Sequence, residues 1–412
     1  MAKAMNPATA LADSPPLRAL RQLFSAADQP HLLLVGGSVR DLLLGRSAAD
    51  TDLLTDLPGE RLRQLGFSLV QGKTTAPIWF RYLPPFGAIE ISPLPQLDQA
   101  SVTADLARRD FTINALALDL TGQLIDPLTG RQDLARRLLR PCSANSFSAD
   151  PLRLFRALRF AAAGWQLHRD CGRAARLHDW QQALLPIAVE RFSRELVKAL
   201  ATPHPERFFL LMLQFNLGRH WLPQLWRFDR IPAGPPENHP EGSLLRHAVL
   251  VLRRCAGTHS DPLWRFCAFF HDLGKLATPA TDLPRHTGHH QAGVSLAHQL
   301  VRQLRLPRRW GQALAAISQL HSAFNRWPLL TADARLQLAH QALKADVTAL
   351  LPAIALADKP DSALPADWPR ALQCAQLSLL ELGISPDQLT QQAPAARASW
   401  IAQQRLHWFT WG

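Results

Sequence analysis

The segment at positions 31–56 constrains the fold of this chain more than any other stretch. Its apolar run Leu32–Val35 ends in Gly36 and Gly37, which is typical of a buried strand that breaks into a tight turn. The residues that follow, 38–44, have the length of a short helix and precede another glycine, a common helix stop. The segment therefore predicts a strand, a turn and a helix in direct succession.

The glycine turn predicts a binding site for an anion. Glycines lack side chains, so the backbone at Gly36 and Gly37 can approach a bulky phosphate closely. The N-terminus of the following helix presents free N–H groups, and Arg40 adds a positive charge. The structural alternative is that the two glycines only form a turn.

Two acidic residues follow the predicted helix. Asp50 and Asp52 lie in Asp-Thr-Asp-Leu-Leu, where strand alternation points both carboxylates to one face of a sheet. Adjacent carboxylates repel each other unless a cation lies between them. Mg²⁺ prefers oxygen ligands and takes its remaining ligands from water and substrate phosphates. We therefore predict that Asp50 and Asp52 bind Mg²⁺, with a solvated strand end as the alternative.

The combined pattern Gly-Gly-x-Val-Arg-Asp-x-Leu-Leu-Gly-Arg-x-x-x-Asp-x-Asp resembles the head-domain signature of the class II nucleotidyltransferases. This family comprises the tRNA CCA-adding enzymes and the bacterial poly(A) polymerases. The resemblance implies that Asp50 and Asp52 are catalytic and that a third acidic residue on a nearby strand supports them. Glu90, between Ile89 and Ile91, is the matching position, and a solvated edge residue is the alternative.

The sequence Arg-Arg-Asp-Phe-Thr-Ile-Asn-Ala at 108–115 is close to a second motif of the same family. By this resemblance Arg109 holds the triphosphate of a nucleotide, Asp110 binds a sugar hydroxyl and Asn114 braces the loop. Without that context, the two arginines and the aspartate would be the charged end of a helix.

A basic helix is predicted in Asp-Pro-Leu-Arg-Leu-Phe-Arg-Ala-Leu-Arg-Phe, where helical spacing places Arg153, Arg156 and Arg159 on one face. A guanidinium beside the carboxylate of Asp150 offers donors and acceptors for the edge of a base. The stretch resembles the family's Glu-Asp-x-x-Arg motif, in which side chains replace a template and select CTP or ATP. Ala149 stands where the family has Glu, and a helix that binds the RNA backbone is the alternative.

The second half of the chain carries histidines and aspartates in the order His, His-Asp, His, His, Asp. Imidazole and carboxylate groups on successive helices can converge on divalent metals. One aspartate can bridge two ions about 3.5–4 Å apart, a spacing that suits phosphoester hydrolysis. The predicted ligands are His247, His271, Asp272, His289, His321 and Asp358. Asp361 competes with Asp358 for the last position.

The runs His-Asp-Leu-Gly-Lys and Arg-His-x-Gly-His resemble the HD phosphohydrolase superfamily and the C-terminal domain of the multifunctional CCA proteins. The resemblance implies a divalent metal, Ni²⁺, Mn²⁺ or Mg²⁺, and activity on phosphomonoesters and 2′,3′-cyclic phosphates. A scaffold that only binds RNA is the alternative.

Composition bears on partners and location. The formal net charge is +12, which suits a polyanion such as tRNA. Most of the positive residues are Arg, which suits phosphate binding, and genome composition is the alternative explanation of this preference for Arg over Lys. The chain has no long uncharged apolar run and its start lacks a secretory apolar block, so we expect no membrane span. The five cysteines follow no ligand spacing and indicate reduced thiols in the cytoplasm.

We predict an α+β fold. A nucleotidyltransferase head with a small mixed sheet and helices on one side covers 1–145, and a helical neck and body that binds base and RNA covers 146–227. An all-α HD-type domain covers 228–363, and a helical tail covers 364–412.

The predicted function is template-independent addition of CMP and/or AMP to the 3′ end of tRNA by two-metal phosphoryl transfer. In the family a flexible basic loop lies between the aspartate pair and the Arg-Arg-Asp motif. Here Ile91 leads through Ser-Pro-Leu-Pro almost directly to Ser101, so the loop is short. Its loss is a feature of members that add only CC. The alternatives are a poly(A) polymerase and a phosphohydrolase whose head only binds RNA.

Overall fold

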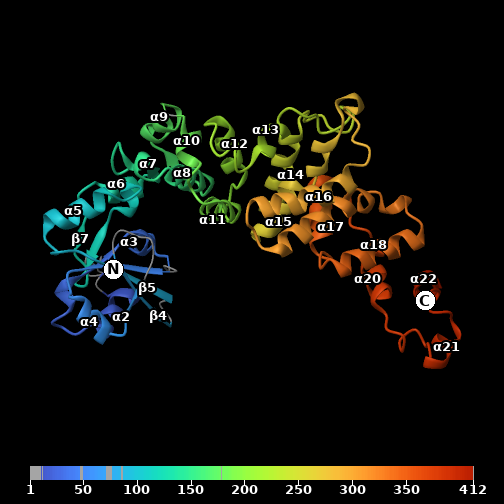
Figure 1. Cartoon of the computed structure of the whole chain (residues 1–412), viewed down its shortest axis with the longest axis horizontal. Coiled ribbons are helices and arrows are strands. Elements are labelled where there is room, and N and C mark those ends of the chain that lie inside the picture. The colour runs from blue at the N-terminus through green and yellow to red at the C-terminus, as the bar shows by residue number, and fades with distance from the viewer. Residues whose placement is uncertain are drawn as a thin grey trace, which may run out of the picture. The chain divides into compact units, whose positions relative to one another are not determined.

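The computed structural model describes residues 11, 13–46, 50–70, 77–84, 87–177 and 179–411. The chain divides into two compact units, 1–180 and 181–412 (Figure 1). The first unit contains the strands, and the second is helical, so the predicted α+β fold with an all-α second half is confirmed.

Unit 1 is built on a seven-stranded mixed sheet with the order β3-β4-β5-β2-β1-β6-β7. Strands β2 and β5 are parallel, and every other neighbouring pair in this sheet is antiparallel. The strands are β1 (Leu32–Val35), β2 (Asp50–Thr55), β3 (Ser68–Val70), β4 (Ile78–Leu83), β5 (Gly87–Pro93), β6 (Ala117–Asp119) and β7 (Leu124–Ile125). Strands β4 and β5 pair in antiparallel register, and Pro85 and Phe86 between them lie outside the described residues.

The helices of unit 1 flank this sheet and continue beyond it. They are α2 (Pro15–Leu23), α3 (Gly37–Leu43), α4 (Gly59–Gln64), α5 (Gln99–Ala107), α6 (Gly130–Ala135), α7 (Ser146–Ala149), α8 (Leu152–Ala162), α9 (Arg169–Leu177) and α10 (Trp180–Leu184), which begins at the last residue of the unit. A second, two-stranded sheet joins β8 (Leu138–Leu139) to β9 (Gln166–Leu167) in parallel.

Helices cover both faces of the large sheet, so the expectation of helices on one side only is wrong. On one face Leu17 of α2 and Leu62 of α4 pack in the core with Ile89. On the other face Val102 of α5 packs with Leu54 of β2. All four residues of β1 are buried, and a strand that is apolar on both sides needs cover on both sides.

The second face is covered only in part. Its core contains residues of β1, β2 and β6 together with α5, and no described residue of β4 or β5 belongs to it. The half of this face over β4, β5 and the start of β2 is therefore not part of either core.

Two local details refine the predicted elements. Helix α2 begins after Ser14, whose side chain makes no capping hydrogen bond, so Pro15 in the first turn marks the start of the helix. Residues 94–98 join β5 to α5, where the short loop was expected. Two hydrogen bonds fix this connection to the end of β2. The N–H of Leu94 donates to the carbonyl of Thr55 at 2.7 Å, and the N–H of Leu97 donates to the Asp56 carboxylate at 3.2 Å.

Unit 2 consists of helices around an aromatic core, in which the rings of Phe209 and Phe269 stack at 3.9 Å. The buried Arg265 donates to the carbonyls of Leu200 and Thr202 at 2.6 and 2.7 Å and so ties two helices together. The helices are α11 (Val189–Leu200), α12 (Glu206–Gln214), α13 (Pro223–Phe228), α14 (Leu244–Thr258), α15 (Pro262–Phe270), α16 (His289–Gln303), α17 (Arg308–Phe324), α18 (Ala332–Lys344), α19 (Leu350–Asp358), α20 (Trp368–Gln376), α21 (Pro386–Gln391) and α22 (Arg397–Trp411).

The Pro- and Gly-rich segment between α13 and α14 forms a loop that is closed by a backbone hydrogen bond. The N–H of Ala233 donates to the carbonyl of Gly242 at 2.8 Å, which closes the loop on itself. Lys275 donates from Nζ to the carbonyl of Ala233 at 2.6 Å. The loop is thus fixed against the helices that follow it.

The remaining composition-based expectations concern thiols and membranes. All five cysteines are free in the structure. Within the described part of the chain, no helix has both the length and the apolar character that crossing a membrane requires.

Candidate active site and candidate metal centre

The register of β2 and β5 brings two of the predicted catalytic residues together. Asp52 is the partner of Glu90 in this parallel pair, so the two side chains lie on the same face of the sheet. Glu90 is exposed and Asp52 is half-buried, which leaves this row of carboxylates open to solvent. Asp50 lies two positions earlier in β2, and its side chain lies outside what the structure describes.

The glycine turn lies directly against these groups. Gly36 adopts a φ of 75°, a conformation that favours glycine. A Cβ atom at this position would lie 2.7 Å from Nη1 of Arg109 and 3.4 Å from Oδ2 of Asp52. Only glycine therefore suits both the backbone and the space between the two side chains. Gly37 begins α3, and the Ser38 hydroxyl accepts a hydrogen bond from the N–H of Asp52 at 3.3 Å.

The Arg-Arg-Asp loop is braced from two sides. Arg109 forms an ion pair with Asp105 at 3.0 Å, which holds its guanidinium beside the turn. Arg153 donates to the carbonyls of Arg108 and Arg109 at 2.7 and 3.2 Å, and also to that of Ser146 at 3.1 Å. Arg153, predicted to read a base, thus also fixes the loop that carries Arg109.

A hydrogen-bonded chain connects the glycine turn to the basic helix. Arg40 donates from Nη1 to Oδ1 of Asn114 at 2.7 Å, and Asn114 donates to Oδ1 of Asp110 at 2.9 Å. Arg156 donates from Nε to Oδ2 of Asp110 at 2.8 Å. Burial raises the pKa of the Asp110 carboxyl, but the charge of Arg156 and the hydrogen bonds from Asn114 and Arg156 outweigh it and hold that pKa below its usual range.

The basic helix α8 has the expected faces. Arg153, Arg156 and Arg159 are half-buried, whereas the leucines and phenylalanines between them are buried. Asp150 lies just before the helix, and its Oδ1 accepts a hydrogen bond from the N–H of Leu152 at 3.2 Å. Ala149, the departure from the family motif, ends α7 and is exposed. The guanidinium of Arg159 lies 4.5 Å from the ring centre of Phe160.

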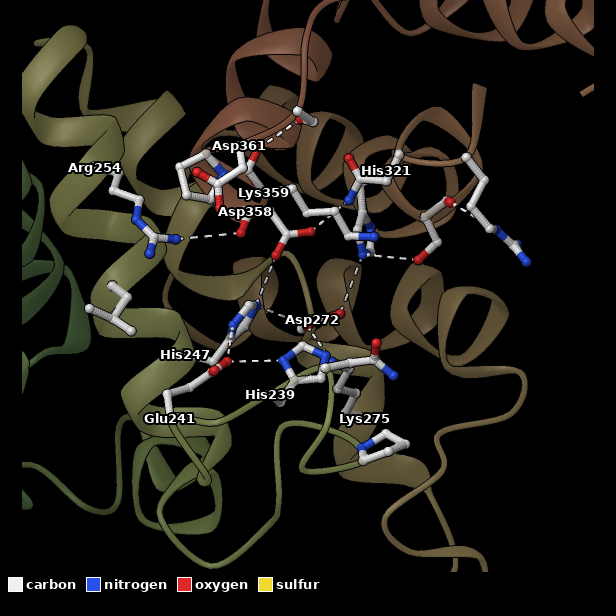
Figure 2. A pocket seen from close by; sticks show the side chains of 18 of the residues that line it. His239, Glu241, His247, Arg254, Asp272, Lys275, His321, Asp358, Lys359 and Asp361 are labelled. Atoms are coloured by element: carbon white, nitrogen blue, oxygen red, sulfur yellow. Dashed lines mark hydrogen bonds and ion pairs between the residues drawn. The ribbon is translucent and has the colours of Figure 1, made fainter. Parts of the chain in front are cut away.

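Unit 2 gathers the predicted metal ligands around Asp272 (Figure 2). The Nε2 atom of His271 lies 3.3 Å from Oδ2 of Asp272. The Nε2 atoms of His289 and His321 lie 3.5 and 3.4 Å from its Oδ1. His271 follows α15, His289 begins α16 and His321 belongs to α17, so three helices supply these imidazoles.

The fourth imidazole joins the last aspartate to this group. Nε2 of His247, in α14, lies 3.1 Å from Oδ1 of Asp358 at the end of α19 and 3.6 Å from Oδ2 of Asp272. Asp358 therefore contacts the cluster directly. Asp361, the competing candidate, lines the surrounding cavity.

Backbone carbonyls orient three of the rings. The Nδ1 atoms of His271, His289 and His321 lie 2.9, 2.6 and 2.8 Å from the carbonyl oxygens of Ala268, His286 and Ile317. Each Nδ1 must carry its proton to donate there, which turns the lone pair of Nε2 toward Asp272. This is the arrangement that metal-binding histidines adopt.

The donor set fits divalent metal ions. His247, His271 and Asp272 form one group of converging ligand atoms, and Asp272, His289 and His321 form a second that shares the same carboxylate. Among the described residues, Oδ1 of Asp272 and Nε2 of His289 are buried without a hydrogen-bond partner. Buried polar atoms rarely lack a partner, and a cation between them would supply it.

Sequence reasoning missed two residues of this site, because they lie in a Pro- and Gly-rich loop that has no periodic pattern. Oε1 of Glu241 lies 2.7 Å from Nδ1 of His247 and 2.9 Å from Nδ1 of His239. The hydrogen bond with His247, opposed by burial, lowers the pKa of Glu241 to about 2. The available signal was the run Glu-Asn-His-Pro-Glu just before the helix of His247. Lys275 was not assigned a role either, and its Nζ lies 2.6 Å from Oδ2 of Asp272.

An open cavity of about 950 Å³ lies over the cluster. Besides the ligands, four basic side chains line it: Arg254, Lys275, Arg326 and Lys359. A cavity with a cationic wall over a carboxylate–imidazole cluster suits an anionic substrate such as a phosphoester.

Comparison with known protein families matches two parts of the chain. Residues 32–75 and 89–140 match the poly A polymerase head domain, and residues 175–229 match a family described as the probable RNA and SrmB-binding site of polymerase A. The first match contains the glycine turn, Glu90 and the Arg-Arg-Asp loop.

Curated relatives cover most of the chain. A multifunctional CCA protein of Legionella pneumophila is 31% identical over 318 residues, which are 71% of this chain and 75% of the relative. A multifunctional CCA protein of Teredinibacter turnerae is 33% identical over 322 residues, with 72% and 75% covered.

Solved structures have the same fold at lower identity. The CCA-adding enzyme of Bacillus stearothermophilus in complex with CTP has a TM-score of 0.65 at 24% identity, with 96% of this chain and 93% of that chain covered. The CCA-adding enzyme of Thermotoga maritima, complexed with tRNA, has a TM-score of 0.61 at 18% identity, with 97% and 93% covered.

Proposed function

This chain belongs to the family of the multifunctional CCA proteins, nucleotidyltransferases with a poly(A) polymerase head, and we propose that it adds CMP and/or AMP to the 3′ end of tRNA. One observation carries the proposal. Asp52 pairs with Glu90 on an open sheet face, beside the Gly36 turn and the Arg109 guanidinium. Similar structures bind CTP and tRNA, and we propose these partners here.

In the proposed reaction Asp50 and Asp52 hold Mg²⁺, with Glu90 as the supporting carboxylate. The metal, when bound, would activate the terminal hydroxyl and neutralise the pyrophosphate leaving group. Gly36 leaves room for phosphates between Asp52 and Arg109, because a side chain there would fill that space.

Charged and polar residues around the turn would hold the nucleotide. We assign the triphosphate to Gly37, Arg40 and Arg109, and the sugar hydroxyl to Asp110, with Asn114 bracing the loop. Asn114 contacts both Arg40 and Asp110, so it can keep these two side chains in place.

Selection of the base is assigned to Asp150, Arg153, Arg156 and Arg159. Three backbone carbonyls hold the guanidinium of Arg153 in place. A guanidinium has five N–H donors, so Arg153 still has donors available for the edge of a base. Rigid placement lets hydrogen bonds discriminate cytosine from guanine and uracil, because a mismatched base would leave polar groups unpaired.

The decisive experiment uses tRNA substrates that end before, within and after CC, with CTP or ATP supplied separately. If only CTP is used and synthesis stops at two residues, the chain adds CC, as the short connection at 94–98 suggests. ATP use on tRNA ending in CC would show CCA addition instead. Repeated addition of AMP to any RNA would identify a poly(A) polymerase, and no incorporation would reject the function.

A second activity is supported by the cluster in unit 2, where the buried unpaired atoms of Asp272 and His289 face each other. We propose metal-dependent hydrolysis of phosphomonoesters or 2′,3′-cyclic phosphates. The metal would polarise the phosphoryl group. Four imidazoles favour Ni²⁺ over Mn²⁺ and Mg²⁺, which prefer oxygen ligands. Lys275 and Arg254 would bind the phosphate.

We further propose that the four predicted segments, 1–145, 146–227, 228–363 and 364–412, act as head, neck and body, hydrolase-like domain and tail. The reduced thiols support a cytoplasmic location.

A further inference from the structure

We propose that Phe80 and Tyr82 form a stacking platform for the terminal bases of the RNA that is being extended. The inference rests on the proposed nucleotidyltransferase function and adds the position of the acceptor strand in the head. Strand β4, which carries both aromatic residues, lies two strands away from the strand of the aspartate pair.

The strand registers place Phe80 in line with the carboxylates. Phe80 pairs with Glu90 across β4 and β5, and Glu90 pairs with Asp52 across β5 and β2. Partners in a register share a face of the sheet. Phe80, Glu90 and Asp52 therefore form one row on the face of the candidate active site.

Tyr82 lies in the next row of the same face. It pairs with Ala88, which pairs in turn with position 50 of β2. Because residues two apart on a strand point to the same side, Phe80 and Tyr82 project together. The small side chain of Ala88 leaves the flank of Tyr82 uncovered.

Both aromatic side chains are open to solvent, with exposed fractions of 36% for Phe80 and 67% for Tyr82. In the described part of unit 1, the exposed large hydrophobic side chains are confined to β3 and β4. The core under α5 does not extend to β4 or β5, so this half of the face has no helix core to join. Apolar groups gathered beside a polar site mark a binding surface.

The groups on the two sides of Asp52 suit the two partners of phosphoryl transfer, the nucleotide triphosphate on one side and the acceptor hydroxyl on the other. Toward β1 lies the Gly36 turn with Arg109, which suits the triphosphate. Toward β5 and β4 lie Glu90 and the aromatic pair. The attacking and leaving oxygens lie on opposite sides of the phosphorus, so the acceptor hydroxyl must arrive from the side away from the pyrophosphate.

The spacing fits the end of a single strand. Neighbouring strands lie about 4.8 Å apart, so roughly 10 Å separate the backbone positions of Phe80 and Asp52. Stacked nucleotides rise about 3.4 Å each, so bases within the last two or three nucleotides reach the aromatic rings. Stacking accepts any base, which suits an acceptor whose terminal base changes after each addition.

Steady-state kinetics and fluorescence test the platform. In the Phe80→Ala/Tyr82→Ala variant we expect the KM for tRNA to rise at least about fivefold and the KM for CTP to stay unchanged, since stacking stabilises each base by about 1–3 kcal/mol. A fluorescent cytidine analogue at the tRNA 3′ end should be quenched by the wild type and not by the variant.

Two controls accompany this variant. Tyr82→Phe keeps the ring and should retain the quenching that the double alanine variant loses. Leu69→Ala removes a side chain that is 41% exposed on the neighbouring strand but pairs with the buried Trp79 on the opposite face, so it should change neither KM nor quenching. Thermal unfolding would confirm that each variant is folded.

Three results would overturn the platform: an unchanged KM for tRNA with retained quenching, a rise confined to the KM for CTP, or an equal effect of Leu69→Ala. The quenching requires no catalysis. If the wild type incorporates no nucleotide, the proposed function fails, and the fluorescence still decides whether the RNA end stacks on Phe80 and Tyr82.

Discussion

Glu241 lies with one carboxylate oxygen 2.7 Å from Nδ1 of His247, whose opposite nitrogen faces Asp358 at 3.1 Å (Figure 2). The carboxylate fixes the tautomer and the direction of the ring, because a proton shared with Glu241 leaves the lone pair of Nε2 toward the cluster. Glu241 thus acts on the candidate metal centre through His247.

We therefore expect Glu241→Ala to weaken metal binding by unit 2 about 10- to 100-fold, the usual effect of removing such a partner. Titration with Ni²⁺ in a calorimeter, on chains that also carry Asp52→Ala to disable the proposed head site, would measure the affinity of unit 2. Glu237→Ala, an exposed carboxylate in the same loop, is the matched control and should bind as the wild type. Equal affinity of wild type and Glu241→Ala would contradict the proposed orienting role.

Substitution of one aspartate in each unit should separate the two activities. Asp52→Ala is expected to abolish nucleotide incorporation and to spare phosphatase activity, because the carboxylate row of the head is lost while the cluster around Asp272 is intact. Asp272→Ala should have the opposite effect. Incorporation of labelled CTP into tRNA and release of phosphate from a model monoester would be measured on the same samples. Loss of both activities from one change would reject the two-site interpretation.

Gly36→Ala should reduce nucleotide incorporation strongly, because its Cβ atom would displace Arg109 from its place beside Asp52. The positive φ adds a loss of about 1–3 kcal/mol in the free energy of unfolding. Gly45→Ala provides the control: its φ is also positive, but a Cβ atom there meets nothing within 4 Å. This variant should lose about 1–2 kcal/mol of stability and keep its activity. Comparable activity of the two variants would show that the space at Gly36 is not needed.

The ion pair of Asp28 and Arg61 should make stability depend on pH in the acid range. Hydrogen bonds from Arg61 and then Ser25 lower the pKa of Asp28 to about 2 from its ordinary 3.8. The folded state therefore binds this proton more weakly than the unfolded state. The stabilisation is complete above about pH 4 and is lost as the pH falls toward 2.

Arg61→Leu should lower the free energy of unfolding at pH 6 and should lower it much less near pH 2.5, as urea titrations at both values would measure. Glu60→Gln removes an exposed ion pair of the same helix and should have little effect at either pH. A difference between Arg61→Leu and the wild type that did not change with pH would exclude this linkage.

Much of the head could be predicted because its signals are local. The run Leu32–Val35 forms the predicted strand, and the arginines of α8 lie on the expected face. The contact between Gly36 and Arg109 follows from the topology, since β1 and the end of α5 meet only in the folded sheet. The family motifs assign both residues to the phosphate-binding site, whereas hydrophobic periodicity does not relate segments so far apart in sequence.

The features that the sequence did not reveal depend on loops without periodicity or on contacts between segments that are distant in sequence. Glu241 and His239 lie in a Pro-rich loop without periodicity, and no sequence pattern indicates that Glu241 contacts both His239 and His247. The four apolar residues of β1 indicate that both faces of the sheet are covered. Which helix covers each face depends on packing between segments that are distant in sequence. The exposure of Phe80 could not be derived from its strand pattern, because an aromatic residue in a strand is usually read as core.

The sheet face beside β4 also has a consequence for engineering. Since that surface contributes to neither core, its side chains can be exchanged with little penalty to folding, whereas Gly36 is confined by its positive φ and by the Arg109 guanidinium. Redesign of the enzyme toward other RNA ends should therefore begin on the exposed side chains of β4, which leaves the proposed catalytic carboxylates unchanged.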